Sequence, residues 1–217
     1  MSTLVAPPVT PPEAGPTEPL EPFDSARTGV RMTADEFVRL PEDDALTRWL
    51  IDGEVWEEPM TVRSAPHTSC ESRVVRRLWD WLDKNLPGGE VASGEAAVRI
   101  PNRETLVGVD VIVLDAETMS AQPPPPERGE GMHVWHGVPR LAVEIMSPSD
   151  RVGDVDAKVR EYLTDGVPLV WVANPVMQTL TVHRPDGPAR TYQGDDAVPG
   201  GDVLPGLDVR AGDLFGG

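Results

Sequence analysis

The chain has 217 residues, of which 19 are Lys or Arg and 36 are Asp or Glu, so its formal net charge is −17 at pH 7. This length supports one sizeable core rather than two full domains, and the acidity argues against tight non-specific DNA binding because the phosphates would be repelled. A single cysteine, no secretory signal and no apolar run near the roughly 20 residues that span a bilayer together predict a cytoplasmic protein without a membrane segment.

The composition of the chain changes near residue 28. Residues 1–28 hold seven of the 24 prolines and few large apolar side chains. Burial of so little apolar surface cannot offset the entropy lost on ordering, which predicts a disordered Pro-rich tail. Residues 29–217 are expected to form a single domain.

The first expected elements are a short helix, a hairpin and a long helix. Thr33 and Glu36 have the spacing of a capping box ahead of the short helix. Apolar runs on both sides of Asp52-Gly53 predict a two-residue hairpin turn, since such turns need positive φ. Over residues 66–86 apolar side chains recur three and four positions apart, which predicts an amphipathic helix.

The rest of the chain alternates strands with one more helix. A long polar connection over residues 116–138 contains four consecutive prolines, and loops of this length are typically functional or mobile. Strands are expected at 91–100, around Asp110, around Glu144, and at 169–173, 179–183 and about 189–192, with a helix over 153–164. This order predicts a mixed sheet flanked by helices, in the α/β or α+β class.

Two of the apolar strands each carry one acidic residue, Asp110 in Val109–Leu114 and Glu144 in Leu141–Met146. A buried carboxylate is unfavourable unless it is paired, and a hard cation such as Mg²⁺ shared by both acids would satisfy them. Lys158 lies at the edge of the apolar stripe of the following helix, from which its ammonium can reach the acids. Two carboxylates, a metal and a lysine can cleave a phosphodiester by activating water and stabilising charge on the phosphate.

A plainer interpretation of these residues stays open. Asp110 could lie at a strand edge, Glu144 could pair with an arginine, and Asp154 with Lys158 could form a surface ion pair at i,i+4 spacing. Cys70 falls within the long helical pattern, where packing is favoured over a role as catalytic thiol.

A series of short motifs extends over about residues 31–215. In chain order they are Met32–Phe37, Ile51–Val55, Pro66-His67, the Asp110 strand, Pro139–Asp150, Asp154, Lys158, Tyr162, Gly166-Val167, Trp171–Pro175, Val203–Leu207 and Leu214-Phe215. In this order and spacing the chain resembles the Uma-type restriction endonuclease family, a branch of the PD-(D/E)xK nuclease superfamily. The segment Pro139–Asp150 is the most specific of the motifs.

The resemblance implies a restriction-endonuclease-like core with flanking helices and extra antiparallel strands. It also implies a Mg²⁺ (or Mn²⁺) site at Asp110 and Glu144, and an endonuclease that hydrolyses DNA phosphodiester bonds. The superfamily's Pro-Asp is Val109-Asp110 here. Its E-x-K element reads Glu144-Ile145-Met146, and similar proteins place the missing lysine on the next helix, where Lys158 stands.

Further residues are auxiliary candidates. Glu54 matches the family's Gly-Glu element and could be another acid at the metal, or an exposed strand residue. His67 could contact phosphate or act as a base, or be structural. His133 and His136 lack further partners for a zinc site, and Ser147 lies in a sequence that favours a turn over a nucleophile.

Two other functions remain open for the whole chain. One is a non-catalytic interaction or regulatory module that keeps the nuclease fold and could form a homodimer. The acidic composition, the missing E-x-K lysine and the Pro-rich tail favour it. The other is a metal-dependent hydrolase of a small phosphorylated substrate, which the negative charge would hinder less than it hinders binding to long DNA.

Overall fold

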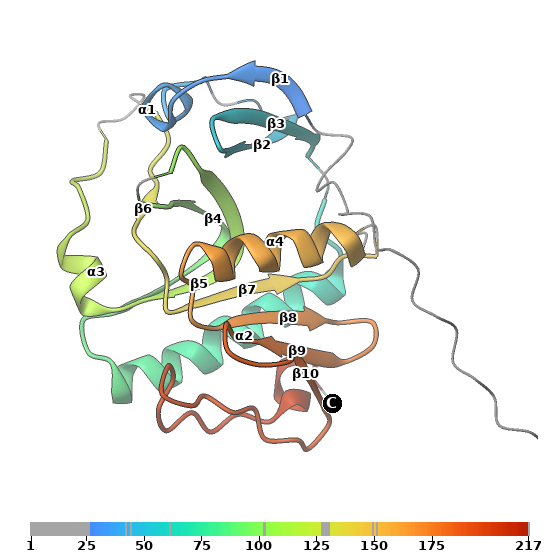
Figure 1. Ribbon diagram of the computed structural model, residues 1–217. Coiled ribbons are helices and arrows are strands. Elements are labelled where there is room, and N and C mark those ends of the chain that lie inside the picture. The colour runs from blue at the N-terminus through green and yellow to red at the C-terminus, as the bar shows by residue number, and fades with distance from the viewer. Residues whose placement is uncertain are drawn as a thin grey trace, which may run out of the picture.

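The computed structural model describes residues 27–41, 43, 45–60, 62–101, 103–126, 131–148, 150 and 152–216 (Figure 1). Residues 1–26, which make up most of the predicted tail, lie outside the described residues. The first strand, β1 (Arg27–Arg31), pairs with β3 and includes the last two residues of the segment predicted to be disordered. The structured part of the chain therefore begins slightly earlier than the sequence indicates.

Ten strands of the described chain form one mixed sheet in the order β1-β3-β2-β5-β7-β8-β9-β10, and β4 pairs with both β5 and β6. The β7–β8 and β4–β6 pairs are parallel, and the other pairs are antiparallel. The remaining strands are β2 (Leu46–Ile51), β3 (Glu54–Pro59), β4 (Glu90–Arg99), β5 (Leu106–Leu114), β6 (Trp135–His136), β7 (Leu141–Ile145), β8 (Val170–Asn174), β9 (Thr179–His183) and β10 (Arg190–Gln193). The predicted mixed α+β class is confirmed.

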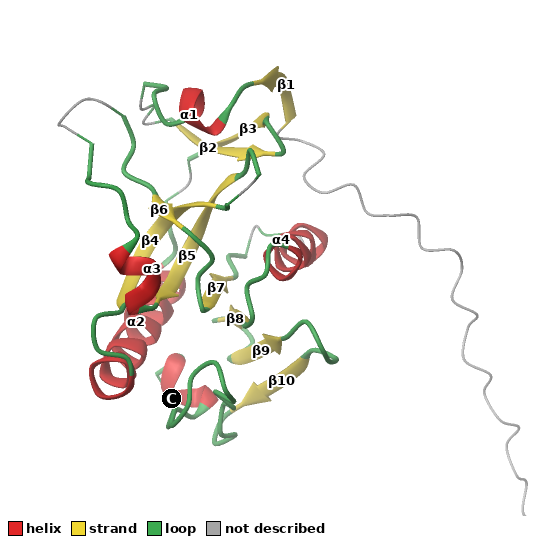
Figure 2. Ribbon diagram, turned by 60° about the vertical axis from the view of Figure 1, so that its left-hand side comes forward, coloured by secondary structure: helices red, strands yellow, loops and turns green. Residues whose placement is uncertain are grey.

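Helices α2 (Ala65–Asn85) and α4 (Val152–Thr164) lie on opposite faces of the central strands (Figure 2). Successive residues of β5 point to opposite faces, so Val111 packs in the core under α2 while Ile112 packs in the core under α4. In the same way Val143 and Ala142 of β7 belong to different cores. Because both faces are covered, these strands read as continuous apolar runs.

Local signals near the beginning of the domain are confirmed. The β2–β3 hairpin turns at Asp52 (φ 48°) and Gly53 (φ 77°), as its sequence predicts. The short helix α1 (Ala34–Phe37) begins at a capping box formed by Thr33 and Glu36.

The segment 116–138 is more ordered than its composition indicates. Helix α3 (Ala116–Ser120) begins where Asp115 accepts a hydrogen bond from the Thr118 N–H, and β6 pairs with β4. The Gln122 side chain bonds to both the N–H and the carbonyl of His136, which closes the segment on itself. Residues 127–130 lie outside the described residues.

The crossover from β7 to β8 through α4 positions the site. Because β7 and β8 are parallel, α4 must run back across the face of the sheet between them. This return places the side chains of α4 above the end of β7 that carries Glu144. Within the described residues, we find no helix that combines the length and apolar character needed to cross a membrane.

Candidate active site

Asp110 is buried in β5 and is held from three directions. Its Oδ2 accepts a hydrogen bond of 2.7 Å from the backbone N–H of Ile145 in β7. Its Oδ1 lies 3.2 Å from Nη1 of Arg63 and 3.5 Å from Nε2 of His67. With 5% of its surface exposed, Asp110 is not the solvent-facing strand-edge acid of the plainer interpretation.

Glu144 lies on the neighbouring strand, where two side chains of α4 reach it. Its Oε1 accepts a 2.6 Å hydrogen bond from the Tyr162 hydroxyl, and its Oε2 accepts one of 3.1 Å from Nζ of Lys158. Lys158 and Tyr162 are four residues apart and therefore lie on the same side of the helix. The predicted approach of Lys158 to the acid pair is thus present, and its ion-pair partner is the buried Glu144.

The surroundings of the two acids shift their pKa values in opposite directions. Burial would raise the pKa of Asp110, but the contacts with His67 and the Ile145 N–H and the charge of Arg63 together lower it. Burial raises the pKa of Glu144, against the opposing charge of Lys158, and the nearby Asp110 raises it further. Such divergence within one pair of carboxylates is typical of functional sites.

The two α4 side chains that contact Glu144 keep their protons. Burial favours a neutral lysine, yet the Glu144 carboxylate raises the pKa of Lys158 above its ordinary value. Burial, with the charge of Glu144, raises the pKa of Tyr162 well above 10. At neutral pH the site therefore contains an ammonium and a phenol, both of which act as hydrogen-bond donors.

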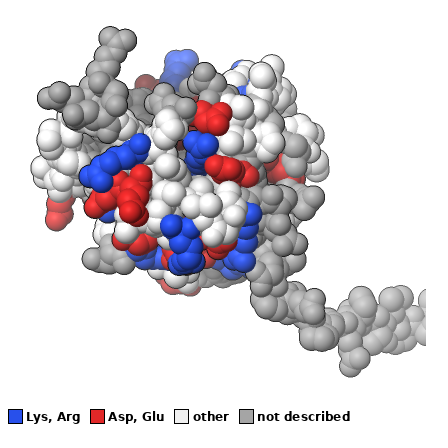
Figure 3. Space-filling view, turned by 90° about the horizontal axis from the view of Figure 1, so that it is seen from above, with Lys and Arg blue, Asp and Glu red and all other residues white. Residues whose placement is uncertain are grey.

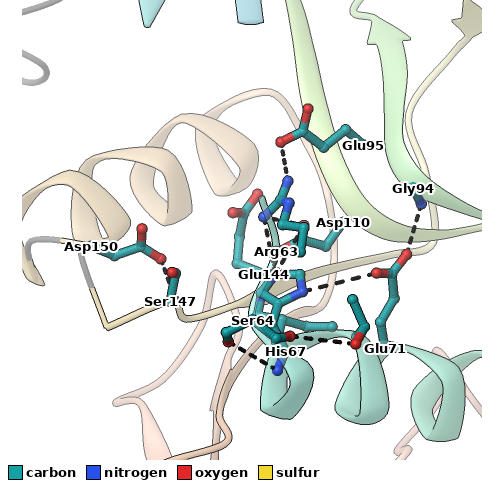
Figure 4. Close-up of polar contacts among 12 residues, drawn as sticks. Arg63, Ser64, His67, Glu71, Gly94, Glu95, Asp110, Glu144, Ser147 and Asp150 are labelled. Carbon is teal, nitrogen blue, oxygen red and sulfur yellow. Dashed lines mark hydrogen bonds and ion pairs between the residues drawn. The ribbon is translucent and has the colours of Figure 1, made fainter. Parts of the chain in front are cut away.

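His67 is supported by a second layer of polar contacts (Figure 4). The side chain is 1% exposed, and its Nε2 lies 3.0 Å from Nη1 of Arg63. The same nitrogen lies 3.5 Å from Oδ1 of Asp110, so it stands between the guanidinium and the carboxylate. Within the described residues Nδ1 has no hydrogen-bond partner, and the Glu71 carboxylate lies 3.9 Å from it. Glu71 in turn accepts a hydrogen bond from the Gly94 N–H.

Two further residues, which no sequence pattern predicts as site residues, contact the site. Arg63 precedes α2 by two residues and contacts Asp110, His67 and Glu95. Glu95 lies at an irregularity in β4, where the register with β5 shifts between Ser93 and Ala96. A glycine inside a strand, here Gly94, often marks such a bulge and could have indicated it. No comparable pattern marks Arg63.

The other sequence candidates contact residues outside this group. Glu54 begins β3 beside the hairpin turn and pairs with Arg27 at 3.9 Å. His133 contacts the Trp135 ring, and the backbone of His136 bonds to Gln122. The Ser147 N–H donates to the Asp150 carboxylate at 2.7 Å, which fits the predicted turn before α4.

The oxygens of the two acids suit a hard divalent cation. Mg²⁺ and Mn²⁺ prefer carboxylate oxygens and retain several waters, so two acids on adjacent strands can hold one. In this structure both oxygens of each acid face protein donors, and an ion must displace some of them. Arg63 and Lys158 are 33% and 26% exposed and so have room to move. Within the described residues no group of three or more His, Cys, Asp or Glu side chains is placed to hold a metal.

A narrow cavity of about 20 Å³ lies between the hairpin and α4, next to the site. Lys158 and Tyr162 line one side of it, and Trp49 and Trp56 line the other. The Lys158 ammonium also lies 5.8 Å from the centre of the Trp49 ring, within reach of a cation–π interaction. The β2–β3 hairpin therefore restricts the positions that the Lys158 side chain can adopt.

Charged side chains of both signs lie close together on the face seen from above in Figure 3. Arg103 illustrates this mixing, since it pairs with Asp52, Glu161 and Asp165 and joins the hairpin turn to the end of α4. The charge of Arg103 is thus neutralised by its acidic neighbours, in keeping with the negative net charge of the chain.

Comparison with known proteins gives a family match and a structural match. The family model Uma2, described as "Putative restriction endonuclease", matches residues 34–212. The structure is similar to the crystal structure of a "putative nuclease belonging to DUF820" from Anabaena variabilis, with a TM-score of 0.68 and 23% sequence identity over 85% of this chain and 98% of that chain. No curated protein matches the sequence. The structural match establishes a shared fold.

Proposed function

The chain belongs to the Uma2 restriction endonuclease family, and from this premise we propose that it is a metal-dependent endonuclease that hydrolyses DNA phosphodiester bonds. In this proposal Asp110 and Glu144 hold Mg²⁺ or Mn²⁺, and Lys158 stabilises the transition state. Glu54, which pairs with Arg27 at 3.9 Å, is an auxiliary acid in this proposal. His67 has a supporting part through its contact with Asp110.

The observation that carries this proposal is the buried acid pair with an ammonium held on it. Glu144 is 6% exposed and is paired with Lys158 at 3.1 Å, and the next residue of the strand, Ile145, donates its N–H to Asp110. Buried ion pairs contribute little net stability compared with apolar packing. Two buried acids on neighbouring central strands, with a lysine on the helix that covers them, are therefore better explained by chemistry than by stability.

The residues of the chain have separable tasks in hydrolysis. The reaction adds a water oxygen to phosphorus and breaks one phosphorus–oxygen bond to a sugar. When bound, the metal ion would supply Lewis acidity and lower the pKa of its water. The Lys158 ammonium can donate to a phosphate oxygen as negative charge develops on it. The Tyr162 hydroxyl holds Oε1 of Glu144 and thereby fixes the direction of Oε2.

Cleavage of supercoiled plasmid DNA by the purified protein tests the proposal. We expect nicked or linear product in Mg²⁺ or Mn²⁺, none in chelator, and none with Asp110→Ala or Glu144→Ala. Equal activity of both variants and the unaltered protein would reject the catalytic assignment. Activity on a small phosphodiester without activity on DNA would instead identify a hydrolase of small substrates.

A second candidate function is a non-catalytic module that retains the nuclease fold. It is favoured by one observation: Arg63, Lys158, Tyr162 and the Ile145 N–H together supply a partner to every carboxylate oxygen of the two acids. The acidic chain is also a poor match for long DNA. Calorimetric titration with Mn²⁺ separates the two functions, because tight binding that Asp110→Ala abolishes would exclude the module.

A further inference from the structure

Arg63 stands where a cation would stand. Its Nη1 lies 3.2 Å from Oδ1 of Asp110, and its Nη2 bonds to Oε1 of Glu95. A guanidinium held between two carboxylates supplies part of the positive charge that a divalent ion would bring. A metal that binds Oδ1 of Asp110 must therefore compete with this arginine.

The second carboxylate is presented by an unusual backbone. Gly94 and Glu95 have φ of 80° and 59°, at the point where β4 shifts register against β5. A non-glycine residue at positive φ is strained, and such strain is retained mainly at functional sites. The bulge turns Glu95 toward Arg63 (Figure 4), so the arginine has an anchor that does not depend on Asp110.

The exposure of the three side chains is graded. Asp110 is 5% exposed, whereas the Arg63 and Glu95 side chains are 33% and 39% exposed. In the series of contacts from Asp110 through Arg63 to Glu95, the Asp110 end is thus buried and the Glu95 end reaches solvent. Arg63 can release Asp110 and keep its contact with Glu95 without crossing the core.

We propose that Arg63 is a positioning residue that sets the metal affinity of the site: it neutralises Asp110 until a divalent cation displaces it toward Glu95. This inference rests on the proposed metal site at Asp110 and Glu144. A purely structural ion pair would behave differently, because its loss would weaken the fold to the same extent with and without metal and would leave metal affinity unchanged.

The test compares Mn²⁺ binding by isothermal titration calorimetry in the full-length protein and three variants. Arg63→Gln removes the competing charge, and Arg63→Lys retains it. Arg48→Gln is the matched control, since Arg48 is also a partly exposed arginine paired with a glutamate, Glu57, but lies in β2 away from Asp110. We expect Arg63→Gln to bind Mn²⁺ about tenfold or more tightly, and Arg63→Lys and Arg48→Gln to bind within about twofold of the unaltered protein.

Thermal melting provides the second readout. Without metal, the melting temperature of Arg63→Gln should be below that of the unaltered protein. Saturating Mn²⁺ should reduce this difference in melting temperature, because binding stabilises the tighter-binding variant more. Equal or weaker Mn²⁺ binding by Arg63→Gln, with Asp110-dependent binding in the unaltered protein, would overturn this inference alone. No binding by either protein would overturn the proposed metal site as well.

Discussion

Asp110 accepts a 2.7 Å hydrogen bond from the backbone N–H of Ile145, the residue that follows Glu144. This contact crosses from β5 to β7, beyond their last paired residues, Val111 and Val143. It therefore fixes one acid against the strand that carries the other. The two carboxylates are held by backbone geometry in a way that neither strand would produce alone.

Replacement of Lys158 should separate catalysis from metal binding. Lys158→Met removes the ammonium that lies 3.1 Å from Glu144 but leaves both proposed metal ligands in place. We expect the rate of plasmid cleavage to fall by about 10²–10³-fold, since a donor to developing charge is lost, while Asp110-dependent Mn²⁺ binding persists. Rates should be measured under single-turnover conditions at saturating metal.

The chain offers a matched control, because its other lysine, Lys84, is exposed at the end of α2. Lys84→Met should cleave at the rate of the unaltered protein. Unchanged cleavage by a folded Lys158→Met protein would remove this residue from the mechanism.

Loss of the Tyr162 hydroxyl should weaken the fold. Tyr162→Phe leaves Oε1 of the buried Glu144 without its 2.6 Å donor. We expect the free energy of unfolding to drop by about 2 kcal/mol, the usual range for a hydrogen bond to a charged group. Urea denaturation followed by circular dichroism measures this. Tyr192→Phe, at the only other tyrosine, should change stability by less than about 0.5 kcal/mol, and an equal loss in both variants would contradict the special role of Tyr162.

The turns, caps and contacts that the sequence predicts correctly are those whose signal is local. Asp52-Gly53 determines its own turn, and Thr33 with Glu36 determines its own cap. Asp110 and Glu144 could be recognised because a single acid in an apolar strand is conspicuous. The position of Lys158 follows from helical spacing, since it needs only the helix and the strand before it.

The residues that were missed depend on contacts between distant segments. Arg63 meets Asp110 across 47 positions and Glu95 across 32, and nothing near it in the chain indicates either contact. Glu54 shows that a local motif does not reveal which residues a side chain contacts. Its place in a recognisable motif predicts an acid at the site, but its partner in the structure is Arg27, because β1 pairs alongside β3.

Arg103 should be important for stability although it lies outside the proposed chemistry. It pairs with Asp165, whose side chain is 3% exposed, as well as with Asp52 and Glu161. Arg103→Gln leaves a buried carboxylate without its cation, and we expect a loss on the order of 2 kcal/mol in the free energy of unfolding. Arg48→Gln, at a partly exposed surface pair, should lose less than about 1 kcal/mol. If both variants lost a similar free energy of unfolding, the ion pairs of Arg103 between the hairpin and α4 would contribute no more stability than a surface ion pair.

Cys70 should react with thiol reagents only when the protein unfolds. It is 1% exposed, and burial raises its pKa to about 12. In the unfolded chain its pKa returns to about 8.5, so a shift from pH 7.5 to pH 9 should accelerate labelling of the unfolded protein by increasing its thiolate fraction. Labelling of the folded protein should stay slow at both pH values. Fast labelling by a chromogenic disulfide without denaturant would contradict the burial of this side chain.

The proposed metal centre requires that one divalent ion binds both Asp110 and Glu144. Anomalous diffraction from crystals soaked in Mn²⁺ measures this directly, with Asp110→Asn crystals as the comparison. We predict one manganese peak within about 2.0–2.4 Å of a carboxylate oxygen from each of Asp110 and Glu144, and its loss in the variant. Saturating Mn²⁺ that gives no peak between these two carboxylates, or an equal peak in Asp110→Asn, would contradict the proposed metal centre.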